Sequence, residues 1–178
     1  MITSLGKKAQ RPPDLLELLL ACHERIRRFM ALARTIALRR DVPDAQLIEA
    51  CGDVERYFAR ALQLHVADEE ESILPRLRGL EPELDRALTV MHVQHESHAA
   101  PLAGLLGALG AVAAAPEAAA PRAHLAAIAT ELEQAFAEHL ALEESQIFPR
   151  LARLERGVQD QIRRELRARR TADLEQDA

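Results

Sequence analysis

One thirteen-residue phrase occurs twice in this chain, and it constrains the fold more than any other feature. The first copy runs from His65 to Leu77 and the second from His139 to Leu151, 74 residues later. Eight of the thirteen positions are identical, among them a histidine, two consecutive glutamates and a proline. The identity falls on polar residues that a packing repeat would not need, so the pattern indicates a duplicated helical hairpin that carries a polar site.

The spacing inside the phrase places an imidazole and a carboxylate on one helix face. Residues four apart lie one above the other on a helix, as do His65 with Glu69 and His139 with Glu143. The apolar stripe of each segment leads into these positions, so the four side chains point toward the interior. Burying such groups unpaired costs several kcal/mol each, and a bound metal is the commonest way to satisfy several at once.

Prolines and short polar breaks divide the rest of the chain into long helical segments. Apolar residues recur within them at helical spacing, and Ala113–Pro121 forms an alanine-rich connector. Strand-favouring residues are scarce, with aromatics at 3%. The expected helices cover 14–40, 44–75, 82–109 and 122–153, followed by a short charged helix after Gly157.

These segments predict an all-α fold, an antiparallel up-down-up-down four-helix bundle with a short C-terminal fifth helix. A helical repeat array is the alternative, but only two related units are visible, which is fewer than a stable array needs. We expect a flexible N-terminal segment at 1–13, the bundle at 14–155, and a charged C-terminal helix or tail at 156–178. Arginines 163, 164, 167, 169 and 170 are interpreted as a solvated face of that last helix.

The other two bundle helices also carry histidines on their apolar stripes. His23 lies between Leu19 and Ile26, and His95 lies at the centre of the third helix. His92 and His98 flank His95 on opposite sides. Every helix of the bundle therefore offers at least one inward histidine near its middle.

This arrangement resembles the hemerythrin-like, or HHE cation-binding, proteins over roughly residues 14–155. The resemblance implies two non-haem iron ions with an oxo or hydroxo bridge. In that family two motif carboxylates bridge the irons, and histidines complete each one. Carried over by position, the bridges are Glu69 and Glu143, and the terminal ligands are His23, His65, His95 and His139.

The third helix departs from the pattern of the oxygen carriers, which have two histidines four residues apart. Met91 stands four residues before His95, and His92, three residues before it, is included among the metal ligands as a substitute. If His92 does not bind, one iron gains an open position. His98 is expected at the edge of the core or behind the ligands. The second motif acids, Glu70 and Glu144, are expected to face solvent, although either could also reach a metal.

Imidazole and carboxylate without thiolate suit iron or manganese. A histidine-rich centre carries few anionic ligands, which favours holding a small ligand over activating it. We therefore expect a protein that binds or senses O₂ or NO rather than an enzyme, and no sequence feature suggests an organic-substrate pocket. The alternative is a redox enzyme acting on NO or peroxide, or an iron donor that repairs damaged Fe–S clusters. Repair relatives carry an additional cysteine-bearing N-terminal domain, and here only about a dozen residues precede the first helix.

Charge and composition restrict the partners. The net charge of −5 argues against a nucleic-acid partner. We found no uninterrupted apolar stretch of membrane-spanning length and no apolar leader, so no membrane partner is expected. Cys22 and Cys51 lack disulfide or zinc-ribbon spacing, which suits a reducing cytoplasm.

Overall fold

The computed structural model describes residues 13–176, and every regular element in that range is a helix. The prediction of an all-helical bundle is confirmed. Three short π-helical stretches, labelled η, interrupt the α-helices. In chain order the elements are α1 (Leu15–Leu38), α2 (Asp44–Arg56), η1 (Tyr57–Ala61), α3 (Leu62–Ala67), η2 (Asp68–Ile73), α4 (Leu74–Leu77), α5 (Pro82–Ala114), α6 (Ala119–Leu142), η3 (Glu143–Ile147), α7 (Phe148–Leu151) and α8 (Arg156–Gln176).

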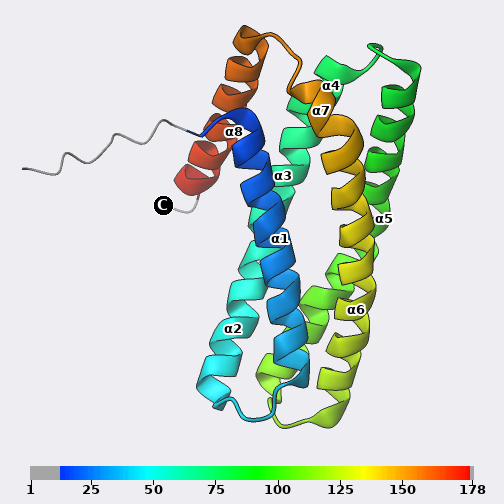
Figure 1. Ribbon diagram of the computed structural model, residues 1–178. Coiled ribbons are helices and arrows are strands. Elements are labelled where there is room, and N and C mark those ends of the chain that lie inside the picture. Colours follow the sequence, from blue (N-terminus) through cyan, green and yellow to red (C-terminus); the bar gives the residue numbers. More distant parts are fainter. Residues whose placement is uncertain (1–12, 177–178) are drawn as a thin grey trace, which may run out of the picture.

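Four long segments lie side by side, and α2 to α4 run as one of them, as do α6 to α7 (Figure 1). The connections between consecutive segments alternate between the two ends of the molecule (Figure 1). The predicted flexible segment 1–13 lies outside the described residues except for Pro13. The chain enters α1 through a capping box: the Glu17 N–H donates to Asp14, and the Asp14 N–H donates to Glu17.

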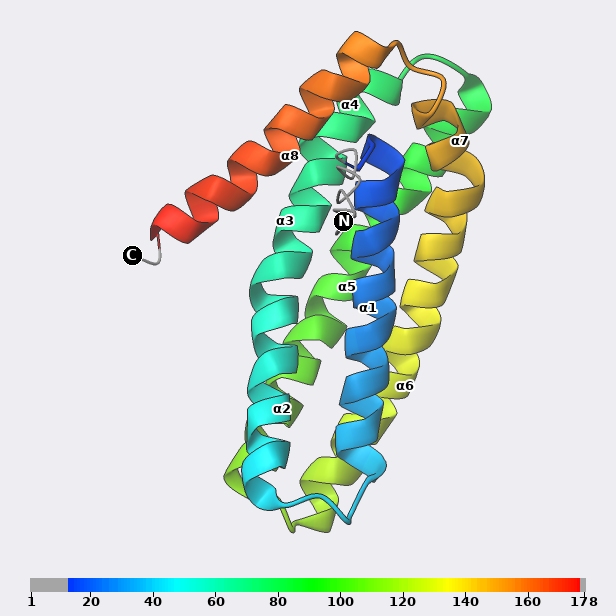
Figure 2. The same ribbon diagram turned by 60° about the vertical axis from the view of Figure 1, so that its left-hand side comes forward.

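The end of α5, the start of α6 and the length of α8 differ from the sequence-based expectation. Helix α5 extends to Ala114 and α6 begins at Ala119, so the predicted alanine-rich connector shrinks to residues 115–118. Alanine has the highest helix propensity, which explains why this stretch continues both helices. Helix α8 spans 21 residues and is not short. It crosses the outside of the bundle at an angle (Figure 2).

The hydrophobic core is divided into two regions, and polar groups lie between them. On α1, Leu19 belongs to the region near α8, whereas Ile26 belongs to the larger region toward the opposite end. Buried His23 lies between these two residues. Helix α6 and η3 repeat the arrangement, with Phe136 in the larger region and Ile147 in the region near α8. The bundle thus places a layer of titratable side chains inside its own core.

Helix α5 is long and apolar enough to cross a membrane by length and composition alone. Core helices of other proteins pass the same test, so this is weak evidence. In this structure α5 packs against α6 and α2 and carries His95 into the polar layer.

Candidate metal centre

The polar layer contains four imidazoles and two carboxylates from all four long segments. Their burial is extreme for titratable groups, with Glu143 and His23 at 0% exposure and Glu69 at 1%. The side chain of His95 is the most exposed of the six, at 7%. The six residues are His23, His65, Glu69, His95, His139 and Glu143.

These six residues form two overlapping groups of four. His23 and His65 belong to one group, and His95 and His139 belong to the other. Glu69 and Glu143 belong to both groups. In each group the four ligand atoms lie within 4.8 Å of one another, close enough to contact one ion. Each carboxylate has two oxygens, so a carboxylate shared in this way can serve two ions at once.

The contacts among these atoms favour metal ligation over an ordinary hydrogen-bond network. Four nitrogen–oxygen pairs are only 3.0–3.3 Å apart: His23–Glu143, His65–Glu69, His95–Glu69 and His139–Glu143. The geometry of these pairs is nevertheless not that of hydrogen bonds: both oxygens of Glu69 and of Glu143, and Nε2 of His23, His65 and His95, have no hydrogen-bond partner. Buried polar groups are rarely left unpaired. Lone pairs that converge on a shared space, with nitrogen and oxygen donors and no thiolate, fit iron, manganese or zinc.

The second glutamate of each motif orients a histidine from another helix. Nδ1–H of His23 donates to Glu144 over 2.7 Å, and Nδ1–H of His95 donates to Glu70 over the same distance. A carboxylate only accepts hydrogen bonds, so the proton stays on Nδ1 and the Nε2 lone pair faces the centre. Glu70 and Glu144 were expected to face solvent, and their side chains are in fact 24% and 31% exposed, because each also accepts a hydrogen bond from a buried imidazole.

An amide has the same role for a third histidine. Nδ1–H of His139 donates to Oε1 of Gln94 over 3.0 Å, which again leaves Nε2 toward the centre. Sequence reasoning did not single out Gln94, although it lies one residue before His95 on the same helix. For His65, neither ring nitrogen has a hydrogen-bond partner.

The local backbone explains how two consecutive glutamates both reach inward. Glu69 and Glu70 lie in η2, and Glu143 and Glu144 lie in η3, so the same wide turn occurs at both copies of the motif. A proline follows η2 and η3 within three residues, Pro75 in the first copy and Pro149 in the second. Proline cannot donate the next helical hydrogen bond, and its ring crowds the preceding turn. A π-turn relieves that conflict by inserting one residue, and such turns are frequent at functional sites.

Burial sets the protonation of the centre. It raises the pKa of Glu69 well above the usual range, and the nearby charge of Glu143 adds to this. Burial would also raise the pKa of Glu143, but contacts with His139 and His23 hold that pKa below its usual range. Burial lowers the pKa of His65 to about 3 and also lowers that of His95. These two imidazoles are therefore neutral near pH 7, as metal ligation requires.

His92 is the one predicted ligand that the structure does not bring to the centre. Its side chain is 46% exposed, and Nδ1 lies 3.0 Å from Glu70. A three-residue step turns a helix by about 300°, so His92 is rotated roughly 60° from His95, toward solvent. Including His92 among the ligands is therefore not supported by this geometry, and each group of four retains two histidines.

His98 is buried beside the centre without belonging to either group of four. Its ring packs edge-on against His139, with ring centroids 5.4 Å apart, and against Phe136 at 5.0 Å. Burial lowers its pKa to about 4, so the ring is neutral near pH 7. The expectation that His98 lies behind the ligands agrees with this position.

An ionic contact ties helix α8 to the motif. Asp68, directly before Glu69, is 0% exposed and receives hydrogen bonds from Arg169 at 2.9 Å and Arg170 at 2.7 Å. Arg169 also donates to Ser72 over 2.8 Å. The interpretation of these two arginines as part of a solvated face is therefore wrong. The second copy has Leu142 at the position of Asp68, so it has no equivalent contact.

The comparison with known proteins agrees with this geometry. A family model described as the hemerythrin HHE cation binding domain matches residues 14–151. That span contains all six residues of the two groups and the glutamates behind them. A comparison with curated proteins found no match.

Proposed function

Because this chain belongs to the hemerythrin HHE cation-binding domain family, we propose that its centre binds two non-haem iron ions. We further propose that the loaded protein binds or senses a small ligand such as O₂ or NO. An antiparallel up-down-up-down bundle is part of the same proposal, supported by connections that alternate between the two ends (Figure 1).

The observation that carries the proposal is that Glu69 and Glu143 belong to both groups of four. A single tetrahedral ion needs four ligands, whereas six converge here. Two carboxylates between two pairs of histidines are the donor set that bundle di-metal sites use. His23 and His65 would hold one ion, His95 and His139 the other, and the carboxylates would lie between them.

When bound, a pair of iron ions supplies reversible redox chemistry and positions at which a small ligand can coordinate. The chain contributes the surroundings of that pair. Glu70, Glu144 and Gln94 fix three imidazoles with Nε2 toward the ions. The two core regions pack above and below the layer along the bundle.

One observation favours the competing function, a redox enzyme acting on peroxide or NO. His92 lies outside both groups, so each ion would have only two histidines and the shared carboxylates as ligands. Such an ion keeps more open positions than one with three histidines. An iron donor for cluster repair would also need weakly held iron with open positions, but no residue on the described surface favours that function.

The decisive experiment combines metal analysis with spectroscopy. Protein reconstituted anaerobically with ferrous iron should hold about two ions per chain, a load consistent with bundle di-iron sites. Its optical spectrum should change reversibly between argon and air if it is a binding protein. Steady consumption of peroxide would instead favour the enzyme, and a folded sample that holds one ion or none would overturn the di-iron proposal.

The role of His92 is tested by a pair of variants. His92→Ala should keep the iron content and the optical spectrum of the parent protein, because the side chain faces solvent. His95→Ala should lose at least one ion. Loss of iron in both variants would show that His92 moves inward to bind.

The remaining proposals concern location and partners. We propose that the protein acts in the cytoplasm. Its acidic balance, with a net charge of −5, supports the proposal that it has no nucleic-acid partner. We propose no membrane partner. The two cysteines form no disulfide, which suits a reducing compartment.

A further inference from the structure

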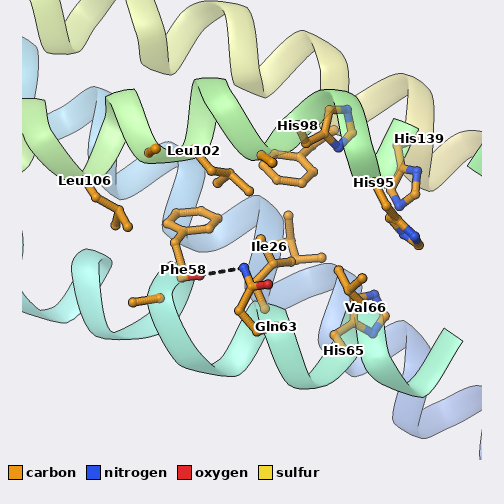
Figure 3. A pocket seen from close by; sticks show the side chains of 15 residues that line it. Ile26, Phe58, Gln63, His65, Val66, His95, His98, Leu102, Leu106 and His139 are labelled. Carbon is orange, nitrogen blue, oxygen red and sulfur yellow. Dashed lines mark hydrogen bonds between the residues drawn. The ribbon is translucent and has the colours of Figure 1, made fainter. Parts of the chain in front are cut away.

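A cavity of about 330 Å³ opens between α3 and α5 and ends at the candidate metal centre. His65, His95 and His139 line its inner end, and Leu106 lies at the other end (Figure 3). The exposed residues Ala59, Gln63, Ala99 and Ala103 also line it, so they mark its mouth. The sequence had suggested no organic-substrate pocket, and the structure differs on this point.

The walls of the cavity are mostly hydrocarbon. Phe58 and Phe136 line it with their rings stacked at a centroid distance of 6.1 Å. Leu102 reaches into the cavity from α5 (Figure 3). None of the fifteen lining residues is Asp, Glu, Lys or Arg. Such walls offer no counter-charge to an ionic ligand and favour burial of a neutral, apolar one.

Irregular backbone and small side chains flank the cavity. Phe58 and Ala59 belong to the π-helical stretch η1. On the other wall, Pro101 lies inside α5, where it cannot donate a helical hydrogen bond. Ala99 and Ala103 lie near that proline and fill little of the space. Several features of the chain, rather than one short side chain, thus coincide at this cavity.

We propose that this cavity binds a neutral, largely apolar organic molecule with one hydroxyl group. Its volume is roughly twice that of a 150 Å³ apolar cavity known to bind benzene, which suggests a ligand of about ten non-hydrogen atoms. An alkyl chain or a single substituted ring meets these limits. The proposal concerns binding to the protein wall and does not require that the centre holds iron.

His98 is the polar partner for the hydroxyl. It lines the cavity at its inner part, is 7% exposed, and makes ring contacts but no hydrogen bond within the described structure (Figure 3). An imidazole can donate to a hydroxyl or accept from it. The amide of Gln63 lies at the mouth and instead donates to the Phe58 carbonyl at 3.4 Å.

The test uses p-cresol and toluene as probes, which differ by one hydroxyl group. Isothermal titration of the purified full-length protein with each probe should show saturable binding to one site. Ala99→Phe and Ala103→Phe should each weaken the binding of both probes by at least about tenfold, because the phenylalanine ring would extend into the cavity. Ala100→Phe is the matched control. Ala100 is also an exposed alanine of α5, but it does not line the cavity, so this variant should leave binding unchanged.

A second variant tests the hydroxyl partner. His98→Phe keeps a ring of similar size but removes the hydrogen bond. It should therefore weaken the binding of p-cresol by about tenfold and leave the binding of toluene unchanged. Metal content measured on the same samples should not differ, which separates failure of this proposal from failure of the di-iron proposal. The inference is overturned if neither probe shows saturable binding. It is also overturned if Ala99→Phe and Ala103→Phe change the affinity for the probes no more than Ala100→Phe does.

Discussion

At the scale of single residues, the two copies of the motif exchange partners. Glu70 follows Glu69 on one segment and binds His95 of α5, whereas Glu144 follows Glu143 and binds His23 of α1. Burial would raise the pKa of each second glutamate, but hydrogen bonds from histidine lower both pKa values, so both acids stay ionised near pH 7. An ionised acceptor behind an imidazole increases its basicity toward a metal.

We predict that this outer carboxylate controls metal affinity without being a ligand itself. Glu144→Ala should weaken metal binding by about ten- to hundredfold, the usual effect of losing such a partner. Glu144→Gln should recover most of the affinity, because its amide oxygen can still accept from Nδ1 of His23. Competition titration with a chelator measures this. Equal loss in both variants would indicate that the charge rather than the orientation matters.

The first glutamates should behave differently. Glu69→Ala or Glu143→Ala should abolish the paired centre, since each removes a ligand from both groups of four. Glu71→Ala is the control, because the Glu71 side chain is 66% exposed and its carboxylate pairs with Arg169, away from the two groups of four. Metal analysis by mass spectrometry distinguishes the variants. Similar metal content in all three would mean that the buried carboxylates are not ligands.

The lowered pKa of His65 predicts a pH-dependent stability for the metal-free protein. The folded pKa is about 3, whereas an unfolded histidine titrates near 6.5. Between these values the unfolded chain binds a proton that the folded chain does not, so falling pH favours unfolding. From pH 7 to pH 5 this costs about 2 kcal/mol.

His65→Gln lacks this titration and isolates the effect from that of Glu69, which has the opposite sign. Urea unfolding of both proteins at the two pH values should show the parent losing about 2 kcal/mol more than the variant. Parallel losses would mean that His65 is accessible to protons in the folded state.

The periodicity of the sequence was sufficient to place the six residues of the two groups of four. A histidine and a glutamate four apart on an apolar stripe share the buried face, which accounts for two pairs, and His23 and His95 lie on the apolar stripes of their own helices. It was insufficient for Glu70, whose partner His95 lies on another helix. The repeated second glutamate was itself a signal, because a solvent-facing acid has no reason to recur in both copies. His92 lies outside both groups of four because a three-residue step suffices for contact along a helix but not for a shared interior point.

At the scale of elements, π-turns explain what helical periodicity could not. A 3.6-residue pattern assigns Glu70 and Glu144 to the outer face, and one inserted residue per turn rotates them inward. The prolines that accompany the turns were visible in both copies. Nothing in the apolar pattern, however, distinguishes a proline that ends a helix from one that follows a π-turn.

Helix α8 should depend on Asp68 for its docking. Removing one partner of a buried ionic contact leaves the other charges uncompensated, which typically costs several kcal/mol. Because Arg169 and Arg170 are partly exposed, we expect Asp68→Ala to cost about 2–3 kcal/mol in urea unfolding. Hydrogen exchange in α8 should rise at the same time.

The matched control is Asp160→Ala on α8 itself. Asp160 pairs with Arg163 at 2.9 Å on the surface, where an ion pair is worth at most about 1 kcal/mol. If the two variants lose the same stability, the burial of Asp68 has no energetic consequence.

At the scale of the whole molecule, we predict that the polar layer makes stability dependent on metal. Six buried titratable groups interrupt the core, and an ion bound only by the folded chain stabilises it by mass action. At a free metal concentration a hundred times the dissociation constant, the unfolding free energy should rise by about 2.7 kcal/mol. The double variant Glu69→Ala, Glu143→Ala should show no such metal dependence in thermal unfolding.

The division of the six buried residues between the two halves of the chain has a consequence for its ancestry. His23, His65 and Glu69 come from the first hairpin, and His95, His139 and Glu143 come from the second. Neither hairpin alone can complete one group of four, because every group borrows a carboxylate from the other half. A single-hairpin ancestor would therefore have bound metal only as a symmetric pair of chains, with the ions at the seam. Fusion of two such genes would have turned an encounter between molecules into an intramolecular one, and would have freed each copy to diverge, as Asp68 and Leu142 have done.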